Sequence, residues 1–84
     1  MLSREIELNI ERLNARYCVL IADRASQFKS SIYFCAPGKT ADAKSLMGLI
    51  SFAPKKGQPF TIKTDGKDEL GAMTAVIELL NSLN

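Results

Sequence analysis

The position that says most about the chemistry of this chain is held by Asn14, whose side chain has almost no reactivity. Asn14 lies in the stretch Arg-Leu-Asn-Ala-Arg-Tyr, residues 12–17, where a strand-like pattern stops and a helix-like pattern begins. Such a junction is a common place for a reactive side chain. The lone pair of an amide nitrogen is delocalised into its carbonyl, so asparagine is neither a base nor a useful nucleophile. The chain contains no histidine, the side chain that most readily exchanges protons near neutral pH.

Two other side chains could carry a chemical group. Cys18 lies one helical turn beyond Asn14, and a thiolate near a helix N-terminus can be activated. Its place on an apolar helical stripe favours a buried, inert thiol instead. Ser45 opens a short helix, where serine is a common N-cap that needs no modification to explain it. A phosphate on that serine would meet free backbone N–H groups and a favourable dipole end.

The residue types present predict no metal site and no cofactor. Cys18 and Cys35 are the two cysteines, and without histidine or a paired spacing they leave too few ligands for a metal. Both lie in apolar sequence surroundings, so we expect free thiols that act as small apolar side chains in a reducing compartment. A disulfide between them stays open as an alternative.

Length and composition fit one small globular domain, which we expect to span residues 1–84. Hydrophobic residues at 46% and charged residues at 24% are ordinary values, and a formal net charge of +2 is too small to indicate nucleic acid by itself. No apolar run approaches the ~18 residues that span a bilayer. The first residues lack the apolar core of a signal peptide, so the expectation is a soluble cytoplasmic protein.

Strand and helix periodicities follow one another in the order βαββαβα. The predicted strands cover residues 5–10, 30–35, 39–43 and 59–64, and the predicted helices begin at Ala15, Leu46 and Asp68, the second ending at about Phe52. Asn14 and Ser45 are the predicted N-caps of the first two helices. The inward side chains are predicted to be Ile6, Leu8 and Ile10 on the first strand; Cys18, Ile21, Ala22, Ala25 and Phe28 on the first helix; Phe60 and Ile62 on the last strand; and Leu70, Met73, Val76, Ile77 and Leu80 on the last helix. Strands with one apolar face need a cover, which predicts helices packed on one face of a sheet.

Several segments resemble a known family. Leu-Asn-Ala-Arg at residues 13–16 precedes the first helix, and Ala-Lys-Ser-Leu-Met-Gly-Leu at 43–49 opens the second. With Gly-Lys at 38–39 and Lys-Lys-Gly at 55–57, they make the chain similar to HPr, the histidine-containing phosphocarrier of the bacterial sugar phosphotransferase system. The resemblance covers nearly the whole chain. It implies an α+β fold, an open-faced β-sandwich in which three helices cover one face of a four-stranded antiparallel sheet.

The chain departs from the family pattern at the first signature. Family members usually read Gly-Leu-His-Ala-Arg-Pro there, and the loop that follows the first strand looks shorter in this chain. The resemblance implies that Asn14 holds the position of the phosphorylated histidine, flanked by Arg16, and that Tyr17 replaces the usual proline. Ser45 matches the serine that a kinase phosphorylates for regulation in HPr of many Gram-positive bacteria.

In function the chain resembles catabolite-repression HPr, a family member with glutamine in place of the histidine. The resemblance implies a non-enzymatic regulatory protein whose partners are phosphotransferase enzymes, a serine kinase or a transcription regulator. An exposed apolar patch would allow self-association, so we expect a monomer or weak dimer. A helix of about eight residues cannot bury all its apolar side chains, and we expect Met47 and Phe52 to face solvent beside the charges of Arg16 and Lys44. The expected partner-binding residues are Arg16, Tyr17, Leu20, Leu46, Met47, Ile50 and Phe52.

Two alternatives remain at this point. The chain could be an active phosphocarrier with a relocated acceptor, Cys18. It could also be a nucleic-acid-binding module that uses its basic residues with Tyr33 and Phe60 on the wet face of the sheet. The second ranks last, because the lysines are scattered evenly along the chain rather than clustered; we expect no direct contact with nucleic acid and none with membranes.

Overall fold

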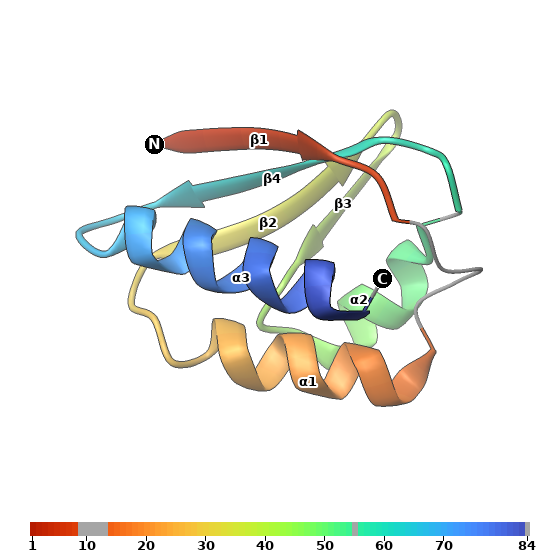
Figure 1. Ribbon diagram of the computed structural model, residues 1–84, viewed down its shortest axis with the longest axis horizontal. Helices are drawn as coiled ribbons and strands as arrows, with labels where there is room; N and C mark the ends of the chain where they lie inside the picture. The colour runs from red at the N-terminus through yellow and green to blue at the C-terminus, as the bar shows by residue number, and fades with distance from the viewer. Residues whose placement is uncertain (9–13, 55, 84) are drawn as a thin grey trace.

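The computed structural model describes residues 1–8, 14–54 and 56–83. Its elements are β1 (Leu2–Ile6), α1 (Ala15–Ala25), β2 (Ser31–Ala36), β3 (Lys39–Asp42), α2 (Leu46–Phe52), β4 (Phe60–Asp65) and α3 (Glu69–Leu83) (Figure 1). This is the βαββαβα order that the sequence predicts. Within those described segments, no helix combines the length and the apolar character that crossing a bilayer requires.

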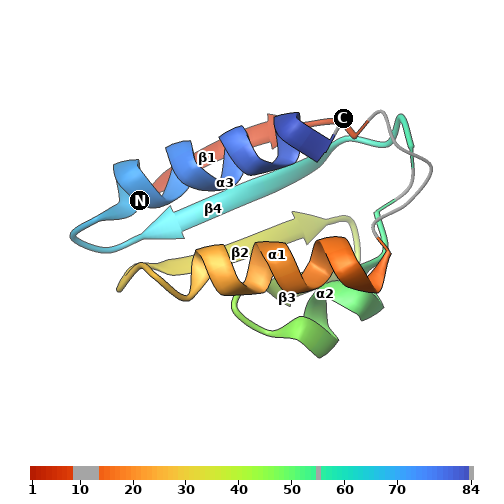
Figure 2. The same ribbon diagram turned by 60° about the horizontal axis from the view of Figure 1, so that its bottom comes forward.

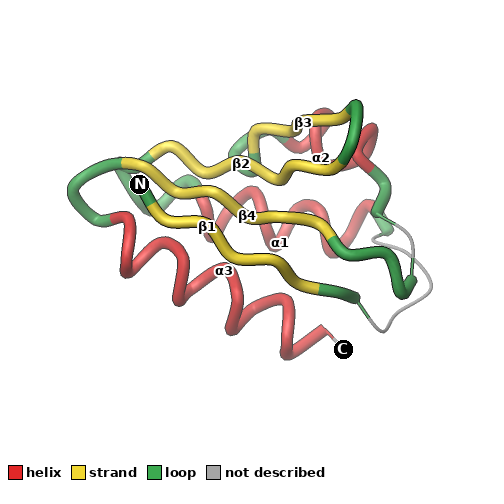
Figure 3. Tube along the Cα trace, turned by 90° about the horizontal axis from the view of Figure 1, so that it is seen from above, coloured by secondary structure: helices red, strands yellow, loops and turns green. Residues whose placement is uncertain are grey.

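The four strands form one antiparallel sheet in the order β1-β4-β2-β3 (Figure 3). β2 and β3 are a hairpin, whereas β4 returns to lie between β1 and β2. All three helices lie on the same side of the sheet (Figures 1 and 2). The other face of the sheet is left uncovered, which confirms the predicted open-faced β-sandwich.

The core lies between the sheet and the helices and is centred on three aromatic rings. Phe34 of β2, Phe52 of α2 and Phe60 of β4 contact one another with ring centroids 5.2–6.1 Å apart. Tilted and edge-to-face pairs at such distances contribute beyond simple burial. The stripe that the sequence predicts for α1 is buried at Cys18, Ile21, Ala22 and Ala25, while Phe28, which follows the end of the helix, is half-buried.

The first strand differs from its predicted bounds. It runs over Leu2–Ile6 rather than 5–10, because Ile6 pairs with Phe60 and β4 has no residue before Phe60 to continue the ladder. Leu8 is buried as predicted but lies beyond the strand, and its carbonyl oxygen accepts a hydrogen bond from the Gly57 backbone N–H at 3.1 Å. Ile10, the third residue predicted to point inward, lies outside the described residues.

The apolar stripe of α3 is confirmed except at its first member. Met73, Val76 and Leu80 are buried and Ile77 is half-buried, but the Leu70 side chain is 68% exposed. The core-facing side of α3 is completed by Ala72 and Ala75, which the sequence reasoning did not select. The helix is therefore rotated so that Leu70 lies at the flank of the core.

Asp68 fastens the start of α3 to the loop between α1 and β2, a contact that sequence reasoning missed. Its carboxylate accepts hydrogen bonds from the backbone N–H of Lys29 at 2.9 Å, from the backbone N–H of Ser30 at 2.8 Å and from the Ser30 hydroxyl. Hydrogen bonds to the ionised form stabilise it. The Ser30 hydroxyl first, and then the Lys29 N–H, lower the pKa of Asp68 from 3.8 to about 2.

The Asp68 contact predicts an acid-dependent part of the stability. Because the pKa of Asp68 is lower in the folded than in the unfolded chain, the stabilisation is fully present above pH 3.8 and is lost as the pH falls towards about 2. We expect Asp68→Asn to lower the urea midpoint of unfolding at neutral pH. Between pH 3.8 and about 2, the midpoint of this variant should fall less with decreasing pH than that of the wild type. Urea titrations of both proteins across this range measure the difference; parallel declines would contradict the assignment.

Candidate functional site

Asn14 immediately precedes α1, and its side chain caps that helix. Its Oδ1 atom accepts a hydrogen bond from the Tyr17 backbone N–H at 3.0 Å, and its carbonyl oxygen accepts one from the Cys18 N–H at 3.1 Å. The extended backbone of Asn14, with φ −76° and ψ 172°, is typical of an N-cap. The predicted cap is confirmed. The amide is exposed but supplies only hydrogen bonds.

The Cys18 thiol one turn further on is fully buried, as its place on the apolar stripe predicts. Burial raises the pKa of the Cys18 thiol, because the thiolate would lose its hydration. Burial and the raised pKa both disfavour a reactive thiol at Cys18. Cys35 is also a free thiol; it is only half-buried and lies on β2, away from α1.

Ser45 is the N-cap of α2, as predicted. Its Oγ atom accepts a hydrogen bond from the Gly48 backbone N–H at 3.1 Å, and its carbonyl oxygen accepts one from the Leu49 N–H at 3.0 Å. A Cβ atom at position 48 would lie 3.2 Å from the Ser45 hydroxyl oxygen. Glycine at this position therefore leaves the space beside the half-buried hydroxyl open.

The exposed apolar residues predicted to bind partners gather on α1 and α2, which pack side by side (Figure 2). Met47 is 70% exposed, Tyr17 is half-buried, and the other apolar members are exposed to intermediate degrees. Arg16 is exposed at the start of α1. We call this surface the helix patch; it consists of Arg16, Tyr17, Leu20, Leu46, Met47 and Ile50.

Phe52 does not belong to the helix patch, which corrects the sequence prediction. It is only 4% exposed, and its ring packs on Phe34 and Phe60. Phe52 follows Leu49 by three residues, so both lie on the same face of α2, and that face is the one packed on the sheet. The chain then turns away through Ala53, whose φ of 42° is left-handed.

Lys44 contributes less to this surface than the sequence suggests. Its Nζ atom donates a hydrogen bond to the Phe28 carbonyl oxygen at 2.8 Å, just beyond the C-terminal end of α1. The ammonium group is therefore held at the opposite end of α1 from Asn14. Arg16 remains as the cation of the helix patch.

The uncovered face of the sheet does not fit a nucleic-acid surface. Tyr33, 40% exposed, pairs with Lys63 on one side and Asp42 on the other, and Glu5 and Asp65 add two further carboxylates to the same face. Phe60, the second aromatic residue of that alternative, is buried in the core. Among the described strand residues, the open face thus holds one lysine and three acidic side chains, the opposite of a basic footprint.

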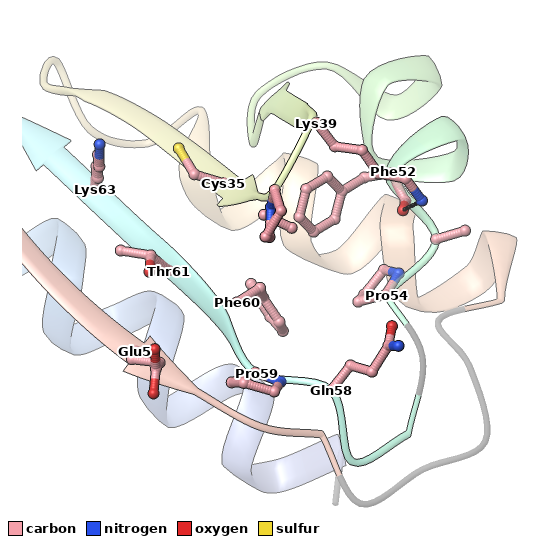
Figure 4. A pocket seen from close by; sticks show the side chains of 13 residues that line it. Glu5, Cys35, Lys39, Phe52, Pro54, Gln58, Pro59, Phe60, Thr61 and Lys63 are labelled. Atoms are coloured by element: carbon pink, nitrogen blue, oxygen red, sulfur yellow. Dashed lines mark hydrogen bonds between the residues drawn. The ribbon is translucent and has the colours of Figure 1, made fainter.

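A depression of about 670 Å³, which sequence reasoning missed, lies at one end of the open face (Figure 4). Its walls come from Glu5, Cys35 and Thr61 of three strands and from Pro54 and Pro59 of the α2–β4 connection. No local sequence signal predicts such a pocket, because its walls meet only through strand order. The Lys39 Nζ atom at its rim donates to the Phe52 carbonyl oxygen at 3.4 Å and so caps the end of α2.

Comparison with known proteins decides the family. The model of the family described as "PTS HPr component phosphorylation site" matches residues 3–82. The chain belongs to the HPr family.

Curated relatives of this HPr-family chain include both HPr and Crh proteins. It is 37% identical over 81 residues to the HPr-like protein Crh of Halalkalibacterium halodurans, covering 95% of this chain and 96% of the relative. It is 39% identical over 82 residues to the phosphocarrier protein HPr of Neisseria meningitidis, covering 96% and 92%. Among solved structures, HPr-C-His of Thermoanaerobacter tengcongensis superposes with a TM-score of 0.89 at 34% identity, covering 98% of this chain and 93% of that one.

The family match covers residues 3–82 and therefore includes Asn14, Cys18 and Ser45. An HPr-family chain of the phosphotransferase system here has a helix N-terminus capped by Asn14, a buried thiol at Cys18 and a serine cap at Ser45. Asn14 caps α1, the helix that carries the patch residues Arg16, Tyr17 and Leu20. Ser45 directly precedes the patch residues Leu46 and Met47 on α2.

Proposed function

We propose that this HPr-family chain is a regulatory or adaptor protein that does not relay phosphate through a histidine. The observation that carries the proposal is Asn14. By the resemblance of residues 13–16 it stands where HPr has its phospho-accepting histidine, and its amide oxygen is engaged in capping α1. An amide there cannot accept and return a phosphoryl group. The protein would act without a catalytic constellation of its own, by binding other proteins.

The helix patch is the surface we assign to partner binding. Exposed apolar side chains gathered on two adjacent helices favour protein contacts, and the Met47 side chain can adapt to more than one partner. Arg16 adds a positive charge beside them. The partners fall into three classes: enzymes of the phosphotransferase system, a serine kinase and a transcription regulator, each meeting a monomer or weak dimer of the chain.

Phosphorylation of Ser45 is the regulatory step we propose. The Ser45 oxygen already faces the Gly48 N–H at 3.1 Å, and a phosphate adds about −1.5 to −2 charges beside such donors. The added charge would lie next to Leu46 and Met47, so it would change which partners the helix patch accepts. The helix itself would persist, because the cap would still offer acceptor oxygens to the free N–H groups.

Two labelling reactions test the proposal. With phosphoenolpyruvate and Enzyme I of the phosphotransferase system, the wild-type chain is expected to take up no acid-labile phosphate. With ATP and an HPr serine kinase it is expected to take up acid-stable phosphate. Ser45→Asn, which keeps a capping acceptor but removes the hydroxyl, should lose this second label, whereas Ser51→Ala on the same helix should keep it.

An acid-labile label on the wild-type chain would overturn the proposal. Mapping that label to Cys18 and losing it in Cys18→Ser would establish the relocated acceptor instead. The burial of the Cys18 thiol and its raised pKa both oppose this outcome.

A further inference from the structure

The short helix α2 contains a glycine that its backbone does not require. Gly48 is the third residue of this helix, and its φ is not positive, in contrast to three other glycines of the chain. Alanine would adopt the same backbone and would favour the helix, since glycine is among the poorest helix formers. The surroundings of Gly48 supply the reason that the backbone does not.

A side chain at position 48 would press on Ser45. A Cβ atom there would lie 3.2 Å from the Ser45 Oγ atom, 3.3 Å from the Ser45 Cβ atom and 3.6 Å from the Asp42 carbonyl oxygen. Non-bonded carbon atoms attract one another best at about 3.5–4.0 Å. The two contacts with Ser45 are therefore too close, and Ser45 would have to give way.

The backbone of Ser45 is held on both sides and does not easily give way. Its N–H donates a hydrogen bond to the Asp42 carbonyl oxygen at 2.9 Å, and its carbonyl oxygen accepts one from the Leu49 N–H at 3.0 Å. The preceding N–H, that of Lys44, donates to the Asp42 carboxylate at 2.9 Å. The side chain would therefore move instead, and its hydroxyl would be displaced from the Gly48 N–H that it accepts from at 3.1 Å.

We propose that Gly48 is a positioning residue for the phosphorylation of Ser45, because the missing side chain leaves one side of the hydroxyl open to the incoming phosphoryl group. In the transfer, the Ser45 Oγ atom bonds to the γ-phosphorus of ATP, the bond from that phosphorus to the bridging oxygen breaks, and ADP leaves. The hydroxyl proton passes to a base of the kinase. Ser45 and Gly48 are both half-buried, so a single methyl group can decide whether the hydroxyl is reached. The inference rests on the proposed function and names the residue that keeps its regulatory site usable.

Gly48→Ala is expected to slow the phosphorylation of Ser45 while the chain stays folded. With ATP and an HPr serine kinase, kcat/KM should fall about tenfold or more, because a small misplacement of a reacting atom is costly. The loss should appear in kcat rather than in KM, since the exposed Leu46 and Met47 side chains are unchanged. Circular dichroism and urea unfolding confirm the fold.

Two substitutions serve as controls and should keep kcat/KM within about twofold of the wild type. Gly71→Ala makes the same chemical change on α3, where the added Cβ atom would lie 3.7 Å from the Phe28 ring, an ordinary contact. Ser51→Ala favours α2 as an alanine does, but Ser51 is exposed near the other end of that helix. Together they separate crowding at Ser45 from a general effect of a more stable helix.

A thiol in place of the hydroxyl tests the same access without a kinase. Ser45→Cys, in a Cys35→Ser background, is treated with a methanethiosulfonate reagent that carries an anionic ethylsulfonate group. The thiol sulfur bonds to the reagent's sulfenyl sulfur, the S–S bond of the reagent breaks, methanesulfinate leaves and the thiol proton passes to water. Adding Gly48→Ala should lower the rate of this reaction about fivefold or more, whereas the two control substitutions should not. Intact mass follows the reaction, and Cys35→Ser alone gives the background from Cys18.

The outcomes separate this inference from the proposed function. A wild-type chain that takes up no phosphate from ATP would overturn the proposed phosphorylation of Ser45, and the role of Gly48 with it. A labelled wild-type chain beside an equally fast Gly48→Ala would overturn the role of Gly48 alone. So would a loss confined to KM with unchanged thiol reactivity, which would make Gly48 a contact of the kinase rather than the residue that keeps the hydroxyl accessible.

Discussion

Asn14→His is expected to take up acid-labile phosphate from phosphoenolpyruvate and Enzyme I, where the wild-type chain takes up none. Histidine Nδ1 and asparagine Oδ1 stand at the same bond distance from the backbone, so Nδ1 would take the place of the oxygen that accepts from the Tyr17 N–H at 3.0 Å. A ring nitrogen that accepts this bond carries a lone pair rather than a proton. A phosphoryl group transferred to it would lie against the free N–H groups at the start of α1. Intact-mass measurement or radiolabel, with acid lability as the criterion, follows the gain.

The controls for Asn14→His separate the acceptor from the docking surface. Asn14→Ala removes the cap at a cost of about 1 kcal/mol and should stay unlabelled. In the Asn14→His background, Met47→Lys should reduce labelling because it alters the helix patch, whereas Leu70→Lys should not. A folded Asn14→His chain that stays unlabelled, beside a histidine-bearing HPr that is labelled in the same tube, would contradict the prediction. It would show that Tyr17 or the altered loop has changed the site as well.

Features decided by neighbouring residues could be predicted from the sequence. The N-caps of α1 and α2 depend on contacts from Asn14 to Tyr17 and from Ser45 to Gly48, each spanning three residues. The apolar stripe of α1 is likewise a local pattern. The elements that position the candidate site were therefore predictable in type and order.

Features decided by long-range pairing could not be predicted in the same way. The end of β1 depends on where β4 begins, more than fifty residues later, and Asp68 meets Ser30 across 38 residues. Phe52 was predicted to be exposed and is buried, whereas Leu70 was predicted to be buried and is exposed. The local pattern of each helix allows either position, and the rotation of the helix on the sheet decides which side chain is buried. The other predicted partner-binding residues are at least partly exposed, as expected, whereas the exposure of Leu70 was missed because Leu70 had been assigned to the core.

Gly66→Ala is expected to be the most destabilising of the proposed substitutions, because the native position excludes a side chain in two independent ways. Gly66 has a φ of 150°, a conformation that residues with a Cβ atom rarely adopt. A Cβ atom there would lie 2.5 Å from the Ser30 hydroxyl oxygen and 2.7 Å from the Ser30 Cα atom. We expect a loss of roughly 2–6 kcal/mol in the free energy of unfolding, from about 1–3 for the backbone strain and about 1–3 for the overpacking.

Gly38→Ala is the control that separates the steric contact with Ser30 from the backbone strain. Gly38 also has a positive φ, 75°, but a Cβ atom there would meet nothing within 4 Å, so strain alone predicts a loss of about 1 kcal/mol. Ser30 cannot easily retreat from a larger residue at position 66, because it is buried and its N–H and hydroxyl are held by Asp68. Urea unfolding of both variants compares them directly. Equal losses in the free energy of unfolding would mean that the β4–α3 turn does not press on Ser30. A larger loss in Gly66→Ala, which becomes smaller when Asp68→Asn is added, would show that the turn and the Asp68 contact stabilise the same loop.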